Sequence, residues 1–379
     1  MDVQTRHDMI VPPSMDEGAR QEFTYSLRYF LYKDLIPGAK SVYEAEVLPQ
    51  IKRSKGGSPK NRHDIAPVME RNPYWQMYSS IRRVTQELMW DTFGEKIEKR
   101  LPGLIEKANQ YRKSNKKLGS IMLNPRLEIP RYHTATDIHI QPGGYHTDLC
   151  KDDVYAGALY DDVIWMFFMH SAGGLNDAPG RSIIKFVKGK WPSLKPKRIL
   201  DMGCTIGHST LPYVDAFPQA EVHAIDVGAP CIRYAHARAE SMGKRVHFSQ
   251  QNAEKTNFPD GHFDLIVSHI MFHETSNKAM PRILEECHRL LAPGGVMVHQ
   301  DIAAKAFQGG VYGEFNVDWS THYNAEPFIG RLIDLDHVQL CVNAGFSPKK
   351  SGELDIPSLR DPAKREVIGP MQHVFFAQR

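Results

Sequence analysis

The sequence predicts an α/β protein whose second half forms a doubly wound, mostly parallel sheet, preceded by a mainly helical N-terminal domain. In the second half, short apolar runs alternate with helical patterns, which is typical of βαβ units. In the first half, large apolar residues recur at helical spacing over long stretches. A chain of 379 residues is long enough for two domains. We therefore expect a helical domain over residues 1–180 and a sheet domain over residues 181–379.

Amphipathic helices are expected to build most of the first half. One apolar pattern runs from Glu22 to Leu35 and is expected to end at Pro37-Gly38, with residues 42–51 as a candidate continuation up to the break at residues 56–59. Another runs from residue 73 to residue 111. Such helices could pack on one another, cap a substrate pocket or join two subunits, and the pattern does not separate these roles. A homodimer is one expectation that follows from them.

Residues 119–150 show a different pattern. Ile121-Met122-Leu123 and residues 137–141 alternate like strands. This segment also carries a group of histidines and tyrosines: Tyr132, His133, His139, Tyr145 and His146. Their spacing matches no standard set of metal ligands, so we expect no metal. These polar groups are expected either to shape a pocket, with Tyr145 and His146 in contact with a substrate, or to be hydrogen-bonded loop residues.

Charge and composition exclude some partners. The net charge of +3 is too small to demand a polyanionic partner. Two basic runs, at residues 52–62 and 112–117, lack the interleaved aromatic residues of a nucleic-acid platform, so a nucleic-acid substrate is disfavoured.

The five cysteines form no C-x-x-C pair and are expected to be reduced thiols. The strongest apolar run, residues 163–169, is too short to span a bilayer. The first residues lack the order of a signal peptide, and we expect a cytoplasmic protein.

A glycine-rich loop in the second half indicates a ligand site. The apolar pair Ile199-Leu200 is followed by Asp201, glycines at 203 and 207, and the helical pattern from His208 onward. Glycines let a backbone approach a ligand closely, and a helix start presents unpaired N–H groups. A P-loop would need Lys and Ser or Thr after its last glycine, and a dinucleotide fingerprint would need G-x-G-x-x-G. Neither pattern fits.

The loop resembles motif I (D-x-G-C-x-x-G here) of the class I S-adenosylmethionine-dependent methyltransferases, a Rossmann-like family, and this resemblance implies a sheet of seven strands. It is similar to the small-molecule group that includes the ubiquinone and menaquinone methyltransferases. Later segments resemble the same family in the same order: residues 221–226, 251–254, 258–268 and 289–298. Thr205 stands where the family usually has a third glycine, and Asn252 replaces its usual Asp. The resemblance covers roughly residues 195–379.

This resemblance implies S-adenosyl-L-methionine as the cofactor and assigns residues to it. The methionine half is expected to lie against Asp201, Gly203, Cys204, Thr205 and Gly207. The ribose and adenine are assigned to Asp226 and Val227, and the adenine edge to Asn252 and Ala253. The predicted cofactor set also includes Glu254 and Ser268.

Candidate catalytic residues follow the ends of two predicted strands. Methyl transfer from a sulfonium requires alignment of donor and acceptor, and a base is needed only for a protonated acceptor such as a hydroxyl. The candidates are His269, His273 and His299. We prefer His273 as a base that faces the pocket, with His269 nearer the cofactor, and a helical conformation would project both from one face. Either could instead be a hydrogen-bonded structural histidine.

A long insert after the fifth predicted strand of the second half supplies further candidates. Tyr312, His322 and Tyr323 lie in this insert and are predicted to contact the substrate. The sequence thus predicts a methyltransferase that acts on a small molecule. O-methylation ranks first because histidines and tyrosines crowd the expected site. The alternatives are N-, S- or C-methylation of a metabolite, RNA methylation, and a non-catalytic interaction module that binds the cofactor.

Overall fold

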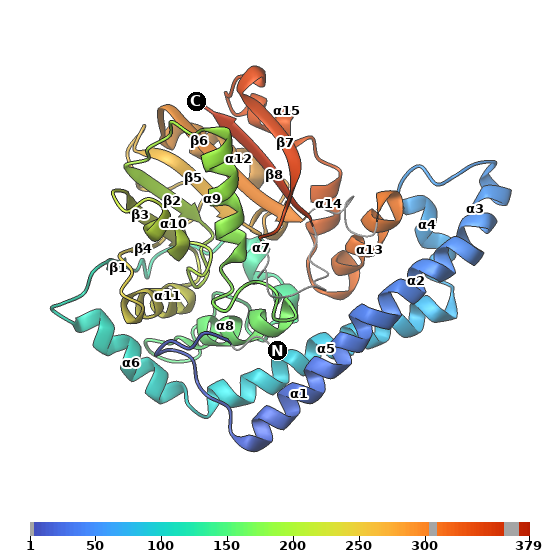
Figure 1. Ribbon diagram of the computed structural model, residues 1–379, viewed down its shortest axis with the longest axis horizontal. Coiled ribbons are helices and arrows are strands. Elements are labelled where there is room, and N and C mark those ends of the chain that lie inside the picture. The colour runs from blue at the N-terminus through green and yellow to red at the C-terminus, as the bar shows by residue number, and fades with distance from the viewer. Residues whose placement is uncertain (1–3, 303–308, 360–370) are drawn as a thin grey trace.

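The computed structural model describes residues 4–302, 309–359 and 371–379. It shows a sheet covered by helices beside a long helical extension, residues 15–98, which we call the helical arm (Figure 1). The strands are β1 (Ser120–Met122), β2 (Arg198–Met202), β3 (Glu221–Asp226), β4 (His247–Gln250), β5 (Phe263–His269), β6 (Leu291–Ile302), β7 (Ser351–Pro357) and β8 (Met371–Gln378). The helices of the first half are α1 (Met15–Phe30), α2 (Ile36–Val42), α3 (Leu48–Lys55), α4 (Arg62–Met69), α5 (Pro73–Glu98), α6 (Leu101–Lys113), α7 (Arg131–Thr134) and α8 (Tyr155–Phe167). Those of the second half are α9 (Ala178–Lys190), α10 (Leu211–Ala216), α11 (Ala229–Ser241), α12 (Ala279–Leu290), α13 (Gly310–Tyr323), α14 (Ile329–Ile333) and α15 (His337–Asn343).

The sheet confirms the predicted α/β class and has one strand more than the seven expected. Its order is β1-β4-β3-β2-β5-β6-β8-β7. Strands β1 to β6 pair in parallel, and β8 runs antiparallel between β6 and β7. The strand order therefore reverses between β2 and β5. In a doubly wound sheet, ligands bind outside the carboxyl ends of the strands at such a switch point.

The additional strand comes from the first half of the chain. Residues Ser120–Met122 pair with residues 247–249 of β4, and the carboxylate of Glu240 accepts hydrogen bonds from the N–H groups of Leu118 and Gly119. A Cβ at Gly119 would lie 2.0 Å from the carbonyl oxygen of Val246, so this approach requires glycine. One strand of the sheet thus lies before residue 180, and the domain boundary proposed there stays a prediction.

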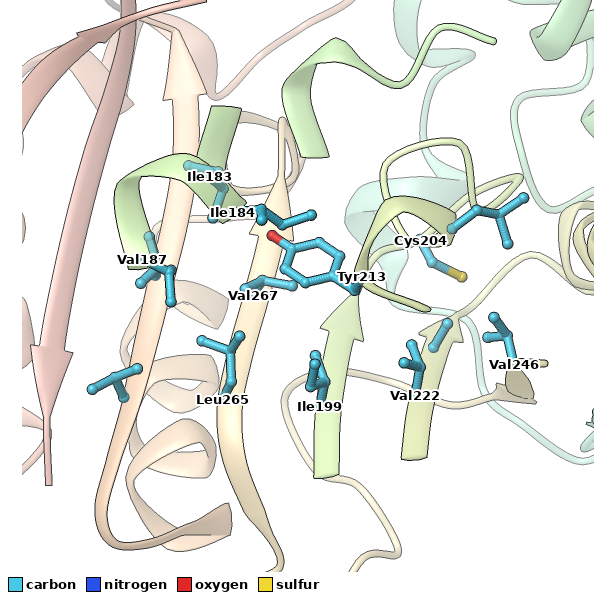
Figure 2. Packing of buried hydrophobic residues seen from close by; sticks show 14 of the residues in the cluster. Ile183, Ile184, Val187, Ile199, Cys204, Tyr213, Val222, Val246, Leu265 and Val267 are labelled. Carbon is cyan, nitrogen blue, oxygen red and sulfur yellow. The ribbon is translucent and has the colours of Figure 1, made fainter. Parts of the chain in front are cut away.

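Two hydrophobic cores lie on the two faces of the sheet. On one face, Ile183, Ile184 and Val187 of α9 and Tyr213 of α10 pack over apolar side chains of β2, β3 and β5 (Figure 2). On the other face, α12 packs Ile283, Leu284 and Cys287 against the alternate residues of the same strands. Because both faces are covered, the strands consist of apolar runs that end in polar residues at the carboxyl edge.

The helical arm is longer than the sequence suggested. The expected stop at Pro37-Gly38 is wrong, because helical structure continues from Met15 to Lys55 through two π-helical turns, Leu31–Leu35 and Tyr43–Val47. Each π turn lies immediately before the first turn of a helix that carries a proline there, Pro37 in α2 and Pro49 in α3. A proline has no N–H to donate, and the wider turn removes the need for that hydrogen bond.

Charged side chains connect the arm to the second half. Arg62 of α4 is 5% exposed, and its guanidinium donates to Asp318 of α13 at 2.8 Å, to the carbonyl of Gly330 at 2.9 Å and to Asp334 at 2.8 Å. Figure 1 shows α13 lying beside α4. The position of the insert that follows β6 thus depends on the arm.

A second connection joins α8 to α11. Asp161 of α8 accepts hydrogen bonds from Tyr234 Oη at 3.0 Å and Arg238 Nε at 3.1 Å, and its other neighbour is the His7 ring at 3.0 Å. These partners hold the pKa of Asp161 below its usual range even though the carboxyl is buried.

No helix of the described residues is long and apolar enough to cross a bilayer.

Candidate active site

The glycine-rich loop and β3 place two carboxylates at the switch point. Asp201 lies opposite Ala224 in the parallel register of β2 and β3, and Asp226 is the last residue of β3. The loop turns back on β3 because Gly203 and Cys204 donate their N–H groups to the carbonyl of Ile225 at 2.8 and 3.0 Å. Adjacent strands therefore deliver both acids to one edge of the sheet.

Three residues of this loop have a left-handed backbone. Gly203 and Gly207 have φ values of +71° and +73°, which glycine adopts without strain. Thr205, at the position where a glycine is usual, also has a positive φ of 48°. Its N–H donates to the carboxylate of Asp226 at 2.9 Å, and that bond offsets part of the cost of the conformation.

The two carboxylates have different environments. Asp226 accepts hydrogen bonds from the N–H groups of Thr205 at 2.9 Å and Gly228 at 2.8 Å. Asp201 accepts one, from Thr210 Oγ1 at 2.5 Å, and its second oxygen is buried without a hydrogen-bond partner. Burial raises the pKa of Asp201 to about 7. An unsatisfied buried carboxylate oxygen at a ligand site is suited to a cationic group.

The other predicted cofactor residues divide into two groups. Asn252 Oδ1 accepts from the N–H of Glu254 at 2.9 Å, so it forms the turn after β4, and the carbonyl of Val227 accepts from Gln250 at 3.0 Å. Glu254 accepts from Tyr132 Oη at 2.7 Å, which brings α7 of the first half to this side. Ser268 is different, because its hydroxyl pairs with His299 in the interior. Cys204 is part of the core on the face of the sheet covered by α9, and Ala253 packs against the core on the face covered by α12.

Of the three candidate histidines, His299 lies deepest. It is fully buried, with its ring against Phe272 and Phe375 and its Nδ1 2.8 Å from Ser268 Oγ. Burial lowers its pKa to about 3, so the ring is neutral. The structure does not bring His299 together with the groups at the strand ends, and its contacts are those of a structural histidine.

His269 and His273 lie in different elements. His269 ends β5, with Nδ1 3.1 Å from Gln300 Oε1 and Nε2 3.3 Å from Tyr213 Oη of α10. His273 lies in the 3-10 turn η4 (Phe272–Glu274). The expected shared helical face is therefore wrong, because β5 extends to His269 and Ile270 then adopts a left-handed φ of 55°.

The ring of His273 is held in a defined orientation. Its Nδ1 lies 2.7 Å from Asp301 Oδ1, while Asp301 Oδ2 accepts the N–H groups of Phe272 and His273. Asp301 is therefore the acceptor for the Nδ1 proton, and the Nε2 atom points to Glu274 Oε1 at 3.2 Å.

A second histidine faces the same carboxylate. His139 Nε2 lies 3.2 Å from Glu274 Oε1 and 3.6 Å from Glu326 Oε1, and its Nδ1 lies 2.5 Å from Tyr145 Oη. Glu326 follows α13 and is also 4.0 Å from His273 Nε2. We call His139, His273, Glu274 and Glu326 the histidine–glutamate cluster. Glu274 and Glu326 raise the pKa of His139, and Asp301 and Glu274 raise the pKa of His273, in both cases against the effect of burial.

The cluster and the glycine-rich loop are adjacent. Met271, between β5 and η4, lies so close to the loop that a Cβ at Gly203 would be 2.7 Å from its Cγ. The ring of Tyr145 stacks edge-on against Tyr160, and a Cβ at Gly228 would lie 2.4 Å from the carbonyl oxygen of Tyr145. Together these groups form one site with a loop on one side and an acid–base cluster on the other.

Comparisons with known proteins agree with this geometry. Residues 199–295 match a family described as a methyltransferase domain. The chain is 32% identical over 139 residues to a demethylmenaquinone methyltransferase of Thermus thermophilus and 30% identical over 154 residues to a malonyl-[acyl-carrier protein] O-methyltransferase of Methylococcus capsulatus. The chain contains an S-adenosylmethionine-dependent methyltransferase domain. The resemblance predicted from its motifs is confirmed.

The alignments leave much of each protein unmatched. They cover 36% and 38% of this chain, and they span 60% and 51% of the two relatives. Among solved structures, the chain is similar to an S-adenosylmethionine-dependent methyltransferase from Aquifex aeolicus, with 20% sequence identity and a TM-score of 0.33. The superposition covers 48% of this chain and 81% of the Aquifex protein. The matched region is the methyltransferase domain itself, and the helical arm lies outside the matched family region.

The predicted substrate residues do not all reach the site of the methyltransferase domain. Tyr145 contacts the histidine–glutamate cluster through His139, and burial lowers the pKa of the neighbouring His146. Tyr312 packs instead on Tyr43 in the core of the helical arm, with ring centroids 4.6 Å apart. His322 and Tyr323 are exposed at the end of α13. Among the described residues of the insert, Glu326 belongs to the histidine–glutamate cluster.

Sequence reasoning missed three members of the site. His139 and Glu274 were visible as polar residues near candidate histidines, yet nothing in the sequence paired them. Glu326 carries no local motif. His139 is positioned by a left-handed φ of 57° in the 3-10 turn η3 (Ile138–Ile140), where its carbonyl accepts from Trp90 Nε1 at 2.8 Å. The strand expected over residues 137–141 is therefore wrong.

Proposed function

We propose that this chain is an S-adenosylmethionine-dependent methyltransferase that acts on a small molecule, with in-line transfer to a hydroxyl oxygen and a histidine base as the first candidate reaction. The observation that carries the proposal is the pairing of the motif I loop, flanked by Asp201 and Asp226, with the histidine–glutamate cluster beyond the end of β5. The first would hold the methyl donor. The second would hold the acceptor.

Each half of the cofactor has a suitable partner. Asp226 is fixed by two backbone N–H groups and retains lone pairs that can accept both ribose hydroxyls. The unpartnered oxygen of Asp201 suits the ammonium of the methionine half. Asn252 with Ala253, after β4, would lie at the adenine edge. These assignments rest on the resemblance together with the positions of the residues at the switch point.

His273 is the candidate base because it is oriented. Asp301 binds its Nδ1, so in the neutral ring Nε2 is the atom that would accept a proton from a bound hydroxyl; the raised pKa means that the ring must first lose its own Nε2 proton. His269 lies on the side of α10, between Gln300 and Tyr213, and would act as a positioning residue near the cofactor. The sulfonium gives up its methyl group without other help, so alignment supplies most of the catalysis.

The charges of the site limit the acceptor. Glu274, Glu326 and Asp301 are carboxylates within or next to the cluster, and within the described part of the chain the ion pairs of Glu274 and Glu326 are with histidines. A carboxylate or phosphate acceptor would be repelled here. Neutral hydroxyl compounds and amines fit better, so N-methylation is the nearest alternative, and RNA methylation is disfavoured.

Two substitutions test the proposal. Asp226→Ala should abolish cofactor binding in calorimetry while the fold persists by circular dichroism. His273→Ala should lower turnover by about 10²–10⁴-fold with cofactor affinity within a few-fold, which is the usual contribution of a general base. His63→Ala, an exposed histidine of α4, is the matched control. Wild-type affinity in the Asp226 variant, or unchanged turnover in the His273 variant, would contradict the assignments.

The quaternary structure and compartment stay predictions. A homodimer is supported by the exposed side chains of Phe23 and Phe30 on α1 and Met77 on α5, which are 64%, 45% and 43% exposed. Light scattering on the purified protein would show twice the chain mass if the homodimer forms.

A cytoplasmic location remains the expectation drawn from the unpaired cysteines.

A further inference from the structure

The ring nitrogens of two histidines converge on one oxygen atom. His139 Nε2 and His273 Nε2 each lie 3.2 Å from Glu274 Oε1. Ligand atoms of these three residues all lie within 4.8 Å of one another. Two ligands about 2.1 Å from a tetrahedral ion are about 3.4 Å apart, so the observed spacing is close to that of a coordination shell.

The outer nitrogens of both rings are already bound. Asp301 binds Nδ1 of His273 at 2.7 Å, and Tyr145 Oη lies 2.5 Å from Nδ1 of His139. Metal-binding histidines are typically oriented in this way, by a carboxylate or another polar group on the nitrogen that does not bind the ion. The second oxygen of Glu274 is buried and has no hydrogen-bond partner, and the side chain as a whole is 12% exposed.

The charge of this region also favours a cation. Three carboxylates, those of Glu274, Glu326 and Asp301, surround two imidazoles in a space where these side chains are between 1% and 18% exposed. Even with both rings protonated, this set of five groups carries a net negative charge. Buried groups of one sign are costly without a counter-charge, and a divalent ion would supply it.

We propose that His139, His273 and Glu274 bind a divalent transition-metal ion of the zinc class and leave its fourth position open, with Glu326 beside the site. Two imidazoles and a carboxylate are the ligands that such ions share in open, catalytic sites. No metal was expected from the sequence, because the ligands come from two segments of the chain that show no ligand spacing. Their proximity arises only in the folded protein.

The ion would activate the methyl acceptor, and this part of the inference rests on the proposed function. A hydroxyl acceptor bound to the ion becomes more acidic, and its proton would leave to Glu326. The oxygen then forms a bond to the methyl carbon as the bond from carbon to sulfur breaks, and the sulfur keeps that electron pair as a thioether. The ion would thus take over from His273 the task of activating the acceptor.

Metal binding can be measured without any methyl acceptor. The full chain is stripped with a chelator, dialysed and titrated with Zn²⁺ by calorimetry, and with Co²⁺ by visible absorption. We expect one tightly bound ion and an intense tetrahedral cobalt spectrum. His139→Gln and Glu274→Gln should each weaken binding at least ten-fold and remove that spectrum. An unchanged affinity in both variants, or the absence of a bound ion in the parent chain, would overturn the inference.

A matched control addresses a second cluster. His337, Glu353 and His373 also have ligand atoms close together, but Glu353 is 40% exposed. Glu353→Gln should therefore leave the tight site and its spectrum unchanged, and loss of that spectrum in this variant would overturn the assignment.

Activity then separates the two proposals. If an ion binds but no acceptor is ever methylated, the proposed function fails and the metal site stands. If methylation proceeds equally with a chelator and no ion binds, the metal site fails and His273 remains the base.

Discussion

Asp201 is the residue at which protonation and cofactor binding should be coupled. Burial raises its pKa to about 7, so near neutral pH the free protein holds this group partly as the neutral acid. The cofactor carries positive charge on its sulfonium and ammonium groups and should bind the ionised form better. Its affinity should therefore rise as the pH increases towards and through 7, by up to about ten-fold per unit below the pKa.

Calorimetry between pH 5.5 and 8.5 checks this expectation. Asp201→Asn should bind the cofactor more weakly and with little pH dependence, because the amide stays neutral. Asp215→Asn is the control, since this carboxylate on α10 is 63% exposed. The sign for stability is opposite: a raised carboxyl pKa means that the unliganded protein loses stability as the pH rises from about 4 to about 7. A flat affinity profile in the parent chain would refute the coupling.

Local residue patterns predicted the glycine-rich loop after β2 but not the histidine–glutamate cluster. The loop from Asp201 to Gly207 is contiguous, so its glycines and its acid could be recognised together. Thr205 shows the limit, because its residue type does not predict the left-handed conformation that the hydrogen bond to Asp226 supports. The histidine–glutamate cluster joins residues 139, 273, 274 and 326, and no sequence spacing encodes that convergence.

At the scale of elements, close packing of α8 on α11 holds the first half against the methyltransferase domain. Gly157 permits this approach, since a Cβ there would lie 2.4 Å from Tyr234 Cβ and 3.3 Å from Cys231 Cα. Gly157→Ala should lower the free energy of unfolding by about 1–3 kcal/mol through overpacking. Urea denaturation followed by circular dichroism measures the change.

Another helical glycine serves as the matched control. A Cβ added at Gly103 of α6 would have no heavy atom within 4 Å, so Gly103→Ala should be neutral or stabilising by up to about 1 kcal/mol. Equal effects of the two substitutions would show that the contact between α8 and α11 is looser than described.

Element types followed from the periodicity of the sequence wherever one face of an element is buried. The alternation of strands and helices from residue 198 to residue 302 was predictable because short apolar strands alternate there with helical patterns. Residues 137–141 alternate like a strand, yet His139 and Ile140 both take left-handed conformations in a 3-10 turn. Here tertiary contacts, among them the bond from Trp90 to His139, override the local pattern.

At the scale of the whole molecule, the helical arm should influence the acceptor site from a distance. Arg62 connects the arm to α13 and α14, and Glu326 lies between those two helices. Arg62→Ala leaves Asp318 without its buried partner and should lower the free energy of unfolding by about 3 kcal/mol. Because α13 would then be less firmly held, turnover should fall as well.

Thermal unfolding and turnover of the same preparation give both readouts. Arg53→Ala, an exposed arginine on α3, should change neither. Reduced stability with full turnover in the Arg62 variant would show that the arm supports the fold without affecting the site.

The position of β8 inside the sheet has a consequence for synthesis of the chain. A ribosome releases β7 before β8, yet in the finished sheet β7 pairs with β8, which also pairs with β6. Until residues 371–378 emerge, β7 has no strand to pair with, and β6 has unpaired hydrogen-bonding groups on the edge that β8 will cover. Such edges recruit other polypeptides, so termination of synthesis before residue 371 would yield an aggregation-prone product.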